Sequence, residues 1–299
     1  MPRTMIISDI HLPRPNRVRA AAQLEPLVEA CDRLLINGDL AEMHNDELIK
    51  ESKAQLDELN RIAERSSTEL LLLSGNHDPE ISPWRAAEFA NGRILVTHGD
   101  AFHPTIAPWA KEARRIKAEW DRVQALHPED KESVNTRFES VRAAALAEWA
   151  HTTGDSGYST VAGVLLRPSA FVKILRHWQR FPMLARSFAG TFFPRAEWIL
   201  VGHTHRKHID RSSTPVVINT GAFGFPTRPL AVILEDDTMT VHQLKKNGMR
   251  WLLDESRPIF STHVEGANLL GTLSGPHSLG GGSTTQSDAS AARTDRAAS

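Results

Sequence analysis

The stretch TMIISDIHL, residues 4–12, decides the fold of this 299-residue chain. Its apolar part, residues 4–8, fits a buried strand, and it leads directly into the polar motif Asp9-Ile10-His11. Side chains two positions apart point to the same face of an extended segment, so Asp9 and His11 are expected to face one metal ion. An isolated Asp-x-His is most often a surface turn, so this interpretation depends on the motifs that follow.

Four further apolar runs end in short polar motifs of the same kind. They are Gly38-Asp39, Gly75-Asn76-His77-Asp78, His98-Gly99-Asp100 and Gly202-His203-Thr204-His205. Each alone is typical of a plain turn, but the complete ordered set indicates a two-metal centre that acts on a phosphate ester. Seven Asp, His and Asn residues of these motifs are the predicted ligands: Asp9, His11, Asp39, Asn76, His98, His203 and His205.

The residue types assign distinct roles within this centre. A carboxylate has two oxygens, so Asp39 is predicted to bridge the two ions. His77 is predicted to protonate the leaving oxygen or to steady the phosphate, with Asp78 holding its second ring nitrogen. Asp100 is a candidate partner for one of the ligating histidines. Mixed oxygen and nitrogen ligands favour Mn, with Zn or Fe as alternatives, over Mg or Ca.

Strand-like and helix-like patterns alternate along the chain, which predicts an α/β sandwich with the site at the strand ends. Further strands are expected at residues 33–37, 69–74, 93–97, 198–201, 216–219, 230–234 and 239–244. Helices are expected at residues 17–30, 46–65, 108–123, 132–150 and 168–193, and a turn at 154–157.

We therefore expect one domain over residues 1–260, with a helical insertion at about 102–195. Residues 261–299 are rich in Gly, Ser, Thr and Ala, and we expect a disordered tail there because few large apolar residues are available for burial.

Bulk composition excludes some classes of protein. The formal net charge is −1, so no general attraction to nucleic acid is indicated. Cys31 is the only cysteine, which rules out an intrachain disulfide and favours a reducing compartment. The chain shows no leader pattern and no apolar run long enough to span a membrane, so a cytoplasmic location is expected.

The five motifs resemble those of the calcineurin-like metallophosphoesterase superfamily, over roughly residues 5–244 apart from the insertion. The resemblance implies a four-layer α/β/β/α sandwich of two facing sheets flanked by helices. It implies that Asp9, His11, Asp39 and His205 bind one metal, and that Asp39, Asn76, His98 and His203 bind the other. His77 matches the catalytic histidine of the family.

The insertion resembles the lid of the UDP-2,3-diacylglucosamine pyrophosphatases, although that branch typically has Arg at the position of His77. A nucleotide-sugar lipid or another membrane-derived phosphoester is therefore one expected substrate. The basic, aromatic segment 167–195 suits contact with an anionic membrane surface, and the alternative is a helix pair that closes over the core. Arg206 is a candidate contact for the substrate phosphate, with a plain surface Arg as the equal alternative.

The expected activity is that of a metal-dependent phosphohydrolase: a phosphomonoesterase, phosphodiesterase or pyrophosphatase that uses a metal-activated water. A nuclease or a cyclic-nucleotide phosphodiesterase would keep this chemistry and change the substrate. A catalytically silent scaffold, as in the retromer scaffold subunit, is the alternative of another class. Such scaffolds lose ligands or the catalytic histidine, whereas here His77 and all the ligand positions are filled, which favours an enzyme.

Overall fold

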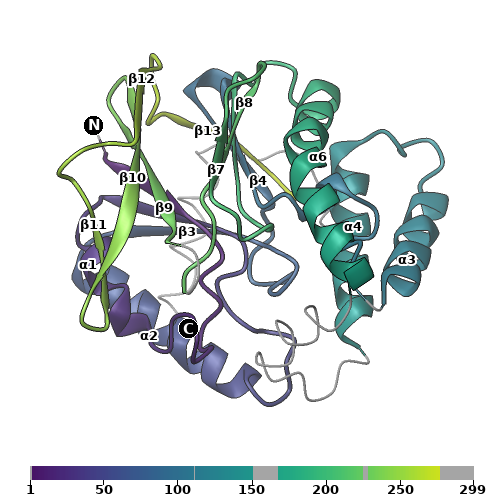
Figure 1. The fold of residues 1–299 in the computed structure, drawn as a ribbon, viewed down its shortest axis with the longest axis horizontal. Helices are drawn as coiled ribbons and strands as arrows, with labels where there is room; N and C mark the ends of the chain where they lie inside the picture. The colour runs from purple at the N-terminus through teal and green to yellow at the C-terminus, as the bar shows by residue number, and fades with distance from the viewer. Residues whose placement is uncertain (1, 111, 151–167, 225–227, 277–299) are drawn as a thin grey trace, which may run out of the picture.

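The computed structural model describes residues 2–110, 112–150, 168–224 and 228–276. Two β-sheets face each other, with helices on both outer sides (Figure 1). The predicted α/β/β/α sandwich is therefore confirmed. The turn expected at residues 154–157 and the tail from residue 277 onward lie outside the described residues.

The first sheet runs in the order β11-β10-β9-β1-β2-β3, and β12 also pairs with β10. Its strands are β1 (Thr4–Ile7), β2 (Arg33–Asn37), β3 (Glu69–Leu73), β9 (Leu230–Glu235), β10 (Thr238–Asn247), β11 (Arg250–Leu253) and β12 (Phe260–His263). Because β1, β2 and β3 are parallel neighbours, their carboxyl ends meet at one edge of the sheet.

The second sheet runs in the order β13-β4-β5-β6-β8-β7. Its strands are β4 (Ala86–Phe89), β5 (Ile94–Thr97), β6 (Trp198–Val201), β7 (His208–Asp210), β8 (Val216–Asn219) and β13 (Leu270–Ser274). Strands β5, β6 and β8 are parallel, so a second set of carboxyl ends also lies together.

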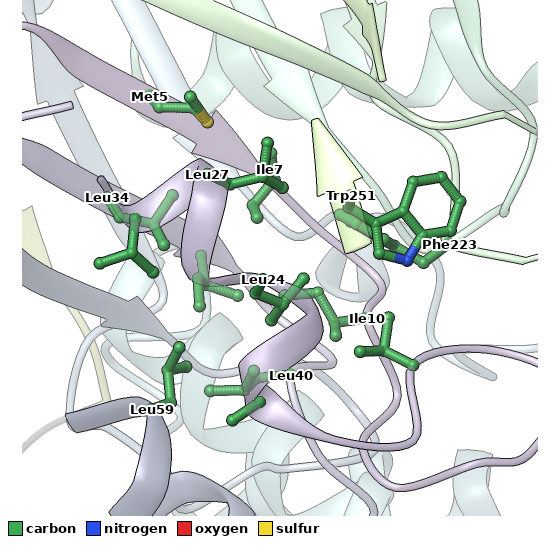
Figure 2. Close-up of a cluster of buried hydrophobic side chains, with 14 of the residues drawn as sticks. Met5, Ile7, Ile10, Leu24, Leu27, Leu34, Leu40, Leu59, Phe223 and Trp251 are labelled. Carbon is green, nitrogen blue, oxygen red and sulfur yellow. The ribbon is translucent and has the colours of Figure 1, made fainter. Parts of the chain in front are cut away.

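Three buried clusters hold the layers together. Figure 2 shows the outer face of the first sheet, where Met5, Ile7 and Leu34 pack against Leu27 and Leu59 from the helices and against Leu24, which directly precedes the first of them. These helices are α1 (Glu25–Val28) and α2 (Ile49–Arg65), with the 3₁₀ turn η1 (Ala21–Gln23) before them. The alternate residues Ile6 and Leu35 belong to the cluster between the two sheets. Burial on both faces explains why these strands read as continuous apolar runs.

The outer face of the second sheet is covered by the chain between β5 and β6. Its described elements are η3 (Asp100–Phe102), α3 (Ala113–Leu126), α4 (Val134–Trp149) and α6 (Pro168–Phe192). Phe138 of α4 and Phe181 and Phe188 of α6 share a buried cluster with Ile199 of β6. A crossover between parallel strands normally packs on the sheet in this way, so the predicted insertion is part of the sandwich as well as a neighbour of the site.

Some sequence-based expectations are wrong. The helix expected at residues 17–30 is only η1 and α1, and Pro26 lies in the first turn of α1 instead of interrupting a longer helix. Strand β4, followed by the 3₁₀ turn η2 (Ala90–Gly92), was not predicted. The chain also stays structured after residue 260: β12 and β13 pair with β10 and β4, and Val264 and Ala267 are buried.

Candidate metal centre

The predicted ligands follow directly after the strand ends of both sheets, and most of them have an unusual backbone. Five of them have φ between 53° and 66°: Asp9, His11, Asp39, His203 and His205. This left-handed region is strained for residues with a Cβ, and such strain clusters at functional sites. The adjacent glycines leave room for the ligands, because a Cβ at Gly75 or Gly202 would overlap the carboxylate of Asp39 or Asp9.

One group of donors consists of Asp9, His11, Asp39 and His205, whose candidate ligand atoms all lie within 4.8 Å of one another. His11 donates its Nδ1 hydrogen to Glu42 Oε1 at 2.9 Å, which leaves the lone pair of Nε2 facing the group. His11 Nε2 lies 3.0 Å from His205 Nε2, and His205 Nε2 lies 3.3 Å from Asp9 Oδ1.

The second group is formed by Asp39, Asn76, His98 and His203. His98 donates from Nδ1 to the carbonyl of Asn37 at 2.9 Å, and its Nε2 points to Asp39 Oδ2 at 3.3 Å. His98 Nε2 is buried and has no hydrogen-bond partner in the described part of the chain. His203 donates from Nε2 to the carbonyl of Ile106 at 3.2 Å, so its Nδ1 lone pair faces Asn76 Oδ1 at 3.0 Å.

These donors fit a pair of divalent cations. Lone pairs that face each other without a hydrogen between them, and a buried nitrogen without a partner, are unfavourable unless a cation lies among them. Asp39 Oδ2 is central to the arrangement, at 3.3 Å from His98 Nε2 and 3.8 Å from His11 Nε2. The carboxylate predicted to bridge therefore lies between the two groups.

The charges at the centre are consistent with cation binding. Burial would raise the pKa of Asp39, but neighbouring imidazoles, His98 first, hold it well below its usual range. Burial would lower the pKa of His98, but the Asp39 carboxylate outweighs it and raises the pKa well above the ordinary value. The buried site thus has a negative potential that favours positive charge next to Asp39.

His77 lies beside this centre, and its partner is Glu42. The Nδ1 atom of His77 donates to Glu42 Oε2 at 3.0 Å, while Nε2 lies 3.9 Å from Asp39 Oδ2. Burial would lower the pKa of His77, but the Glu42 and Asp39 carboxylates raise it to about 9. Glu42 is fully buried and also accepts hydrogen bonds from His11 and Arg14, so its position is fixed from several sides.

The expectation that Asp78 holds His77 is wrong. Asp78 accepts hydrogen bonds from the backbone N–H groups of Asp39, Leu40 and Gly75 at 2.7–3.0 Å. It therefore ties the loop after β2 to the loop after β3. Burial and the nearby Asp39 raise the pKa of Asp78 to about 6.

Two other residues that were predicted from the sequence to serve the site, Asp100 and Arg206, contact different partners in the structure. Asp100 accepts a hydrogen bond from buried Arg85 at 2.9 Å, so the expectation that it holds a ligating histidine is wrong, and a backbone carbonyl has that role at His98. Arg206 is exposed, and its guanidinium lies over the Trp178 ring at 5.7 Å. Its contact with a substrate phosphate stays a prediction.

Sequence reasoning also missed residues that shape the site. Glu42 lies three positions after Asp39, a spacing that could have identified it. Arg17 approaches His205 Nδ1 at 3.3 Å and donates to the Phe223 carbonyl at 2.7 Å, with no signal in the sequence beyond its charge. Asn219, at the end of β8, donates to the Gly202 carbonyl at 2.7 Å and so holds the loop that carries the last two histidines.

The model of the calcineurin-like phosphoesterase family matches residues 2–207, and the chain belongs to this family. A search of curated proteins found no match. Among solved structures, a dimetal phosphatase from Danio rerio is 13% identical, covers 84% of this chain and 98% of its own, and has a TM-score of 0.43. A double mutant of Vps29 from Entamoeba histolytica is 12% identical, with coverage of 84% and 97% and a TM-score of 0.40. These similarities are too distant to transfer an activity.

Proposed function

We propose that this protein is a two-metal phosphoester hydrolase. Asp9, His11, Asp39 and His205 would hold one divalent ion, and Asp39, Asn76, His98 and His203 the other. The observation that carries the proposal is the convergence of candidate ligand atoms on Asp39, among them the buried His98 Nε2 that lacks a hydrogen-bond partner in the described residues, with the Nε2 atom of His77 facing the same carboxylate. Bound ions would polarise the phosphoryl group and make a water molecule nucleophilic.

The residues of the chain supply the remaining chemistry. In the metal-free protein, despite burial, the Glu42 and Asp39 carboxylates raise the pKa of His77 to about 9, and Glu42, which belongs to neither ligand set, would continue to favour the protonated imidazole that a general acid requires. Glu42 holds the Nδ1 atom of His77, so the proton on Nε2 is the one that faces the centre. Burial of the carboxylates and imidazoles strengthens their interaction with a charged phosphoryl group because little water screens them.

The proposal is tested with Mn-loaded protein on a panel of aryl phosphate monoesters, diesters and pyrophosphates. We expect hydrolysis that Asp39→Ala abolishes and that His77→Asn slows in kcat by about 10²–10⁴-fold. Arg122→Ala, on the exposed face of α3, is the matched control and should retain the activity. Equal turnover in wild type and Asp39→Ala, or none on the whole panel, would refute the proposal.

We propose a membrane-derived phosphoester as the substrate, because of the exposed face of α6. Phe171, Val172 and Leu175 are 47%, 42% and 38% exposed, and Lys173 and Arg176 lie among them. An apolar face with cations and no acidic residue suits an anionic lipid surface. No helix in the described part of the chain is long and apolar enough to cross a membrane, so this contact would be peripheral.

Vesicle sedimentation tests this contact. We expect binding to vesicles containing anionic phosphatidylglycerol and weak binding to neutral phosphatidylcholine alone. Phe171→Ser with Leu175→Ser should weaken it, whereas Leu126→Ser, an exposed apolar residue on α3, should not. Binding that does not depend on vesicle charge, or that is unchanged in the double variant, would contradict the peripheral role of α6.

A further inference from the structure

The insertion is hydrogen-bonded directly to the loops that carry the predicted ligands. Trp149, the last residue of α4, donates its indole N–H to the backbone carbonyl of Asn76 at 2.9 Å. Trp178 of α6 donates its indole N–H to the carbonyl of Thr204 at 3.1 Å, between His203 and His205. A third bond runs the other way, from His203 Nε2 to the carbonyl of Ile106.

The ring of Trp149 makes a second contact at the same place. It stacks on His44 with the ring centroids 3.4 Å apart and the planes 21° apart. His44 in turn donates from Nδ1 to the carbonyl of His77 at 2.7 Å. One side chain of the insertion therefore braces two consecutive residues of the loop after β3, Asn76 directly and His77 through His44.

The ligand side chains of the other half of the centre are held by the two-sheet core, although Trp178 also touches the backbone next to His205. His11 is held by Glu42 at 2.9 Å, and His205 by Arg17 at 3.3 Å. Asp9 accepts from the side chain of Ser8, which also bonds to Thr220 Oγ1 at 2.6 Å. These partners all come from the two-sheet core, and the described hydrogen bonds of Asp9, His11, Asp39 and His205 include none to residues 102–195.

We propose that Trp149 is a positioning residue through which the insertion sets metal affinity at the Asn76, His98 and His203 position, and that Trp178 steadies the backbone between His203 and His205, which serve different positions. The inference rests on the proposed two-metal function. Asn76 contributes no charge to an ion, so its value as a ligand depends on accurate placement of its oxygen. Residues that orient ligands in this way typically change metal affinity by about 10–100-fold.

Phenylalanine substitutions isolate the hydrogen bonds from the packing. Trp149→Phe and Trp178→Phe keep an aromatic ring and remove the indole N–H. Trp198→Phe is the matched control, because Trp198 is a half-buried indole of β6 that packs on the Phe260 ring, away from the loops of the centre. Thermal unfolding of each metal-free protein shows whether the variants are folded before metal is added.

The readout is Mn²⁺ binding, followed by titration calorimetry and by electron paramagnetic resonance, which distinguishes paired from isolated ions. We expect wild type and Trp198→Phe to bind two ions as a coupled pair. In Trp149→Phe, one ion should keep its wild-type affinity and the other should bind about 10-fold or more weakly, so that isolated Mn²⁺ appears at intermediate concentrations. Trp178→Phe should weaken both ions, because Thr204 lies between a ligand of each position.

Two results would overturn the inference. In Trp149→Phe both ions could keep their affinities, or both could weaken equally, which would mean that the Trp149 indole does not position the Asn76 ligand selectively. If wild type itself bound fewer than two ions, the proposed two-metal function would fail first. The stoichiometry of wild type therefore separates failure of the function from failure of the inference.

Discussion

The backbone strain at the ligands has a local cause. Just after the strands end, the chain turns through the left-handed region at five of the ligands: Asp9, His11, Asp39, His203 and His205. Each such residue costs about 1–3 kcal/mol and persists only where the surroundings fix it. Here the fixing contacts are visible: the carboxylate of Asp78 accepts from the backbone N–H of Asp39, and that of Asp9 accepts from the N–H of His203.

Removing the charge of Glu42 should change the pH dependence of catalysis. Glu42 helps to raise the pKa of His77, so in Glu42→Gln that pKa should fall and His77 should lose its proton at lower pH. A general acid must be protonated, so kcat at pH 8 should fall by about 10–100-fold and the alkaline limb should move to lower pH. The measurement is a kcat profile against pH, with Glu69→Gln, a half-exposed partner of Arg33, as the control. An unchanged profile would exclude this role for Glu42.

His177 should make the fold sensitive to acid. It is 5% exposed, and burial with the nearby His203 and His103 lowers its pKa to about 3. Below pH 6.5 the unfolded chain binds a proton at this histidine that the folded chain does not, so stability falls as pH falls from 6.5 toward 3. At pH 5 the imidazole of His177 alone lowers the free energy of unfolding by about 2 kcal/mol.

Between pH 7 and pH 5, the free energy of unfolding should therefore fall by about 2 kcal/mol less in His177→Phe than in wild type. Denaturant unfolding at both pH values measures this difference. His263→Gln, on the exposed side of β12, should follow wild type. Equal acid sensitivity in His177→Phe and wild type would show that the burial of His177 does not matter for this effect.

The strands that lead into the motifs were predictable because each is an apolar run buried on both faces. Strand β2 was predicted to the residue, at Arg33–Asn37. Strands β4 and β13 were not predicted, because their sequences AAEF and LGTLS lack a run of β-branched or aromatic residues. They form because they pair with each other and β4 with β5, a tertiary effect that overrides the weak local preference.

Strand β13 should contribute to stability although it lies in a stretch of tail-like composition. Leu273 is 9% exposed and belongs to the cluster between the sheets, so Leu273→Ala should lower the free energy of unfolding by about 2 kcal/mol. Leu269→Ala, at a residue that is 50% exposed, is the matched control and should stay within about 0.5 kcal/mol of wild type. Denaturant unfolding measures both variants, and the dependence of the unfolding free energy on denaturant concentration should stay unchanged. Equal denaturation midpoints for Leu273→Ala and wild type would mean that β13 does not contribute to stability.

The order of the motifs predicts that they meet, because parallel strands of one sheet present their carboxyl ends at one edge. The sequence does not predict which neighbour holds which side chain. Asp78 is adjacent to His77 along the chain and Glu42 lies 35 positions away, yet Asp78 faces the backbone of the loop after β2 and Glu42 faces the imidazole. That choice depends on side-chain directions set by the strained turns, which local sequence patterns do not encode.

Metal binding should stabilise the whole sandwich, because the ligands come from both sheets. Asp9 and Asp39 follow strands of the first sheet, while His98, His203 and His205 follow strands of the second. An ion at 100 times its dissociation constant adds about 2.7 kcal/mol. For a domain of this size that raises the unfolding temperature by about 4–5 °C for each ion.

Calorimetry of chelator-treated protein with and without Mn²⁺ measures this shift. Asp39→Asn should lose most of it, because Asp39 lies between both donor groups, whereas Asp121→Asn, at an exposed carboxylate on α3, should keep it. Comparing the shift within each variant removes any effect of the substitution on the metal-free fold. A shift of equal size in Asp39→Asn and wild type would place the stabilising ions elsewhere on the molecule and would contradict the proposed centre.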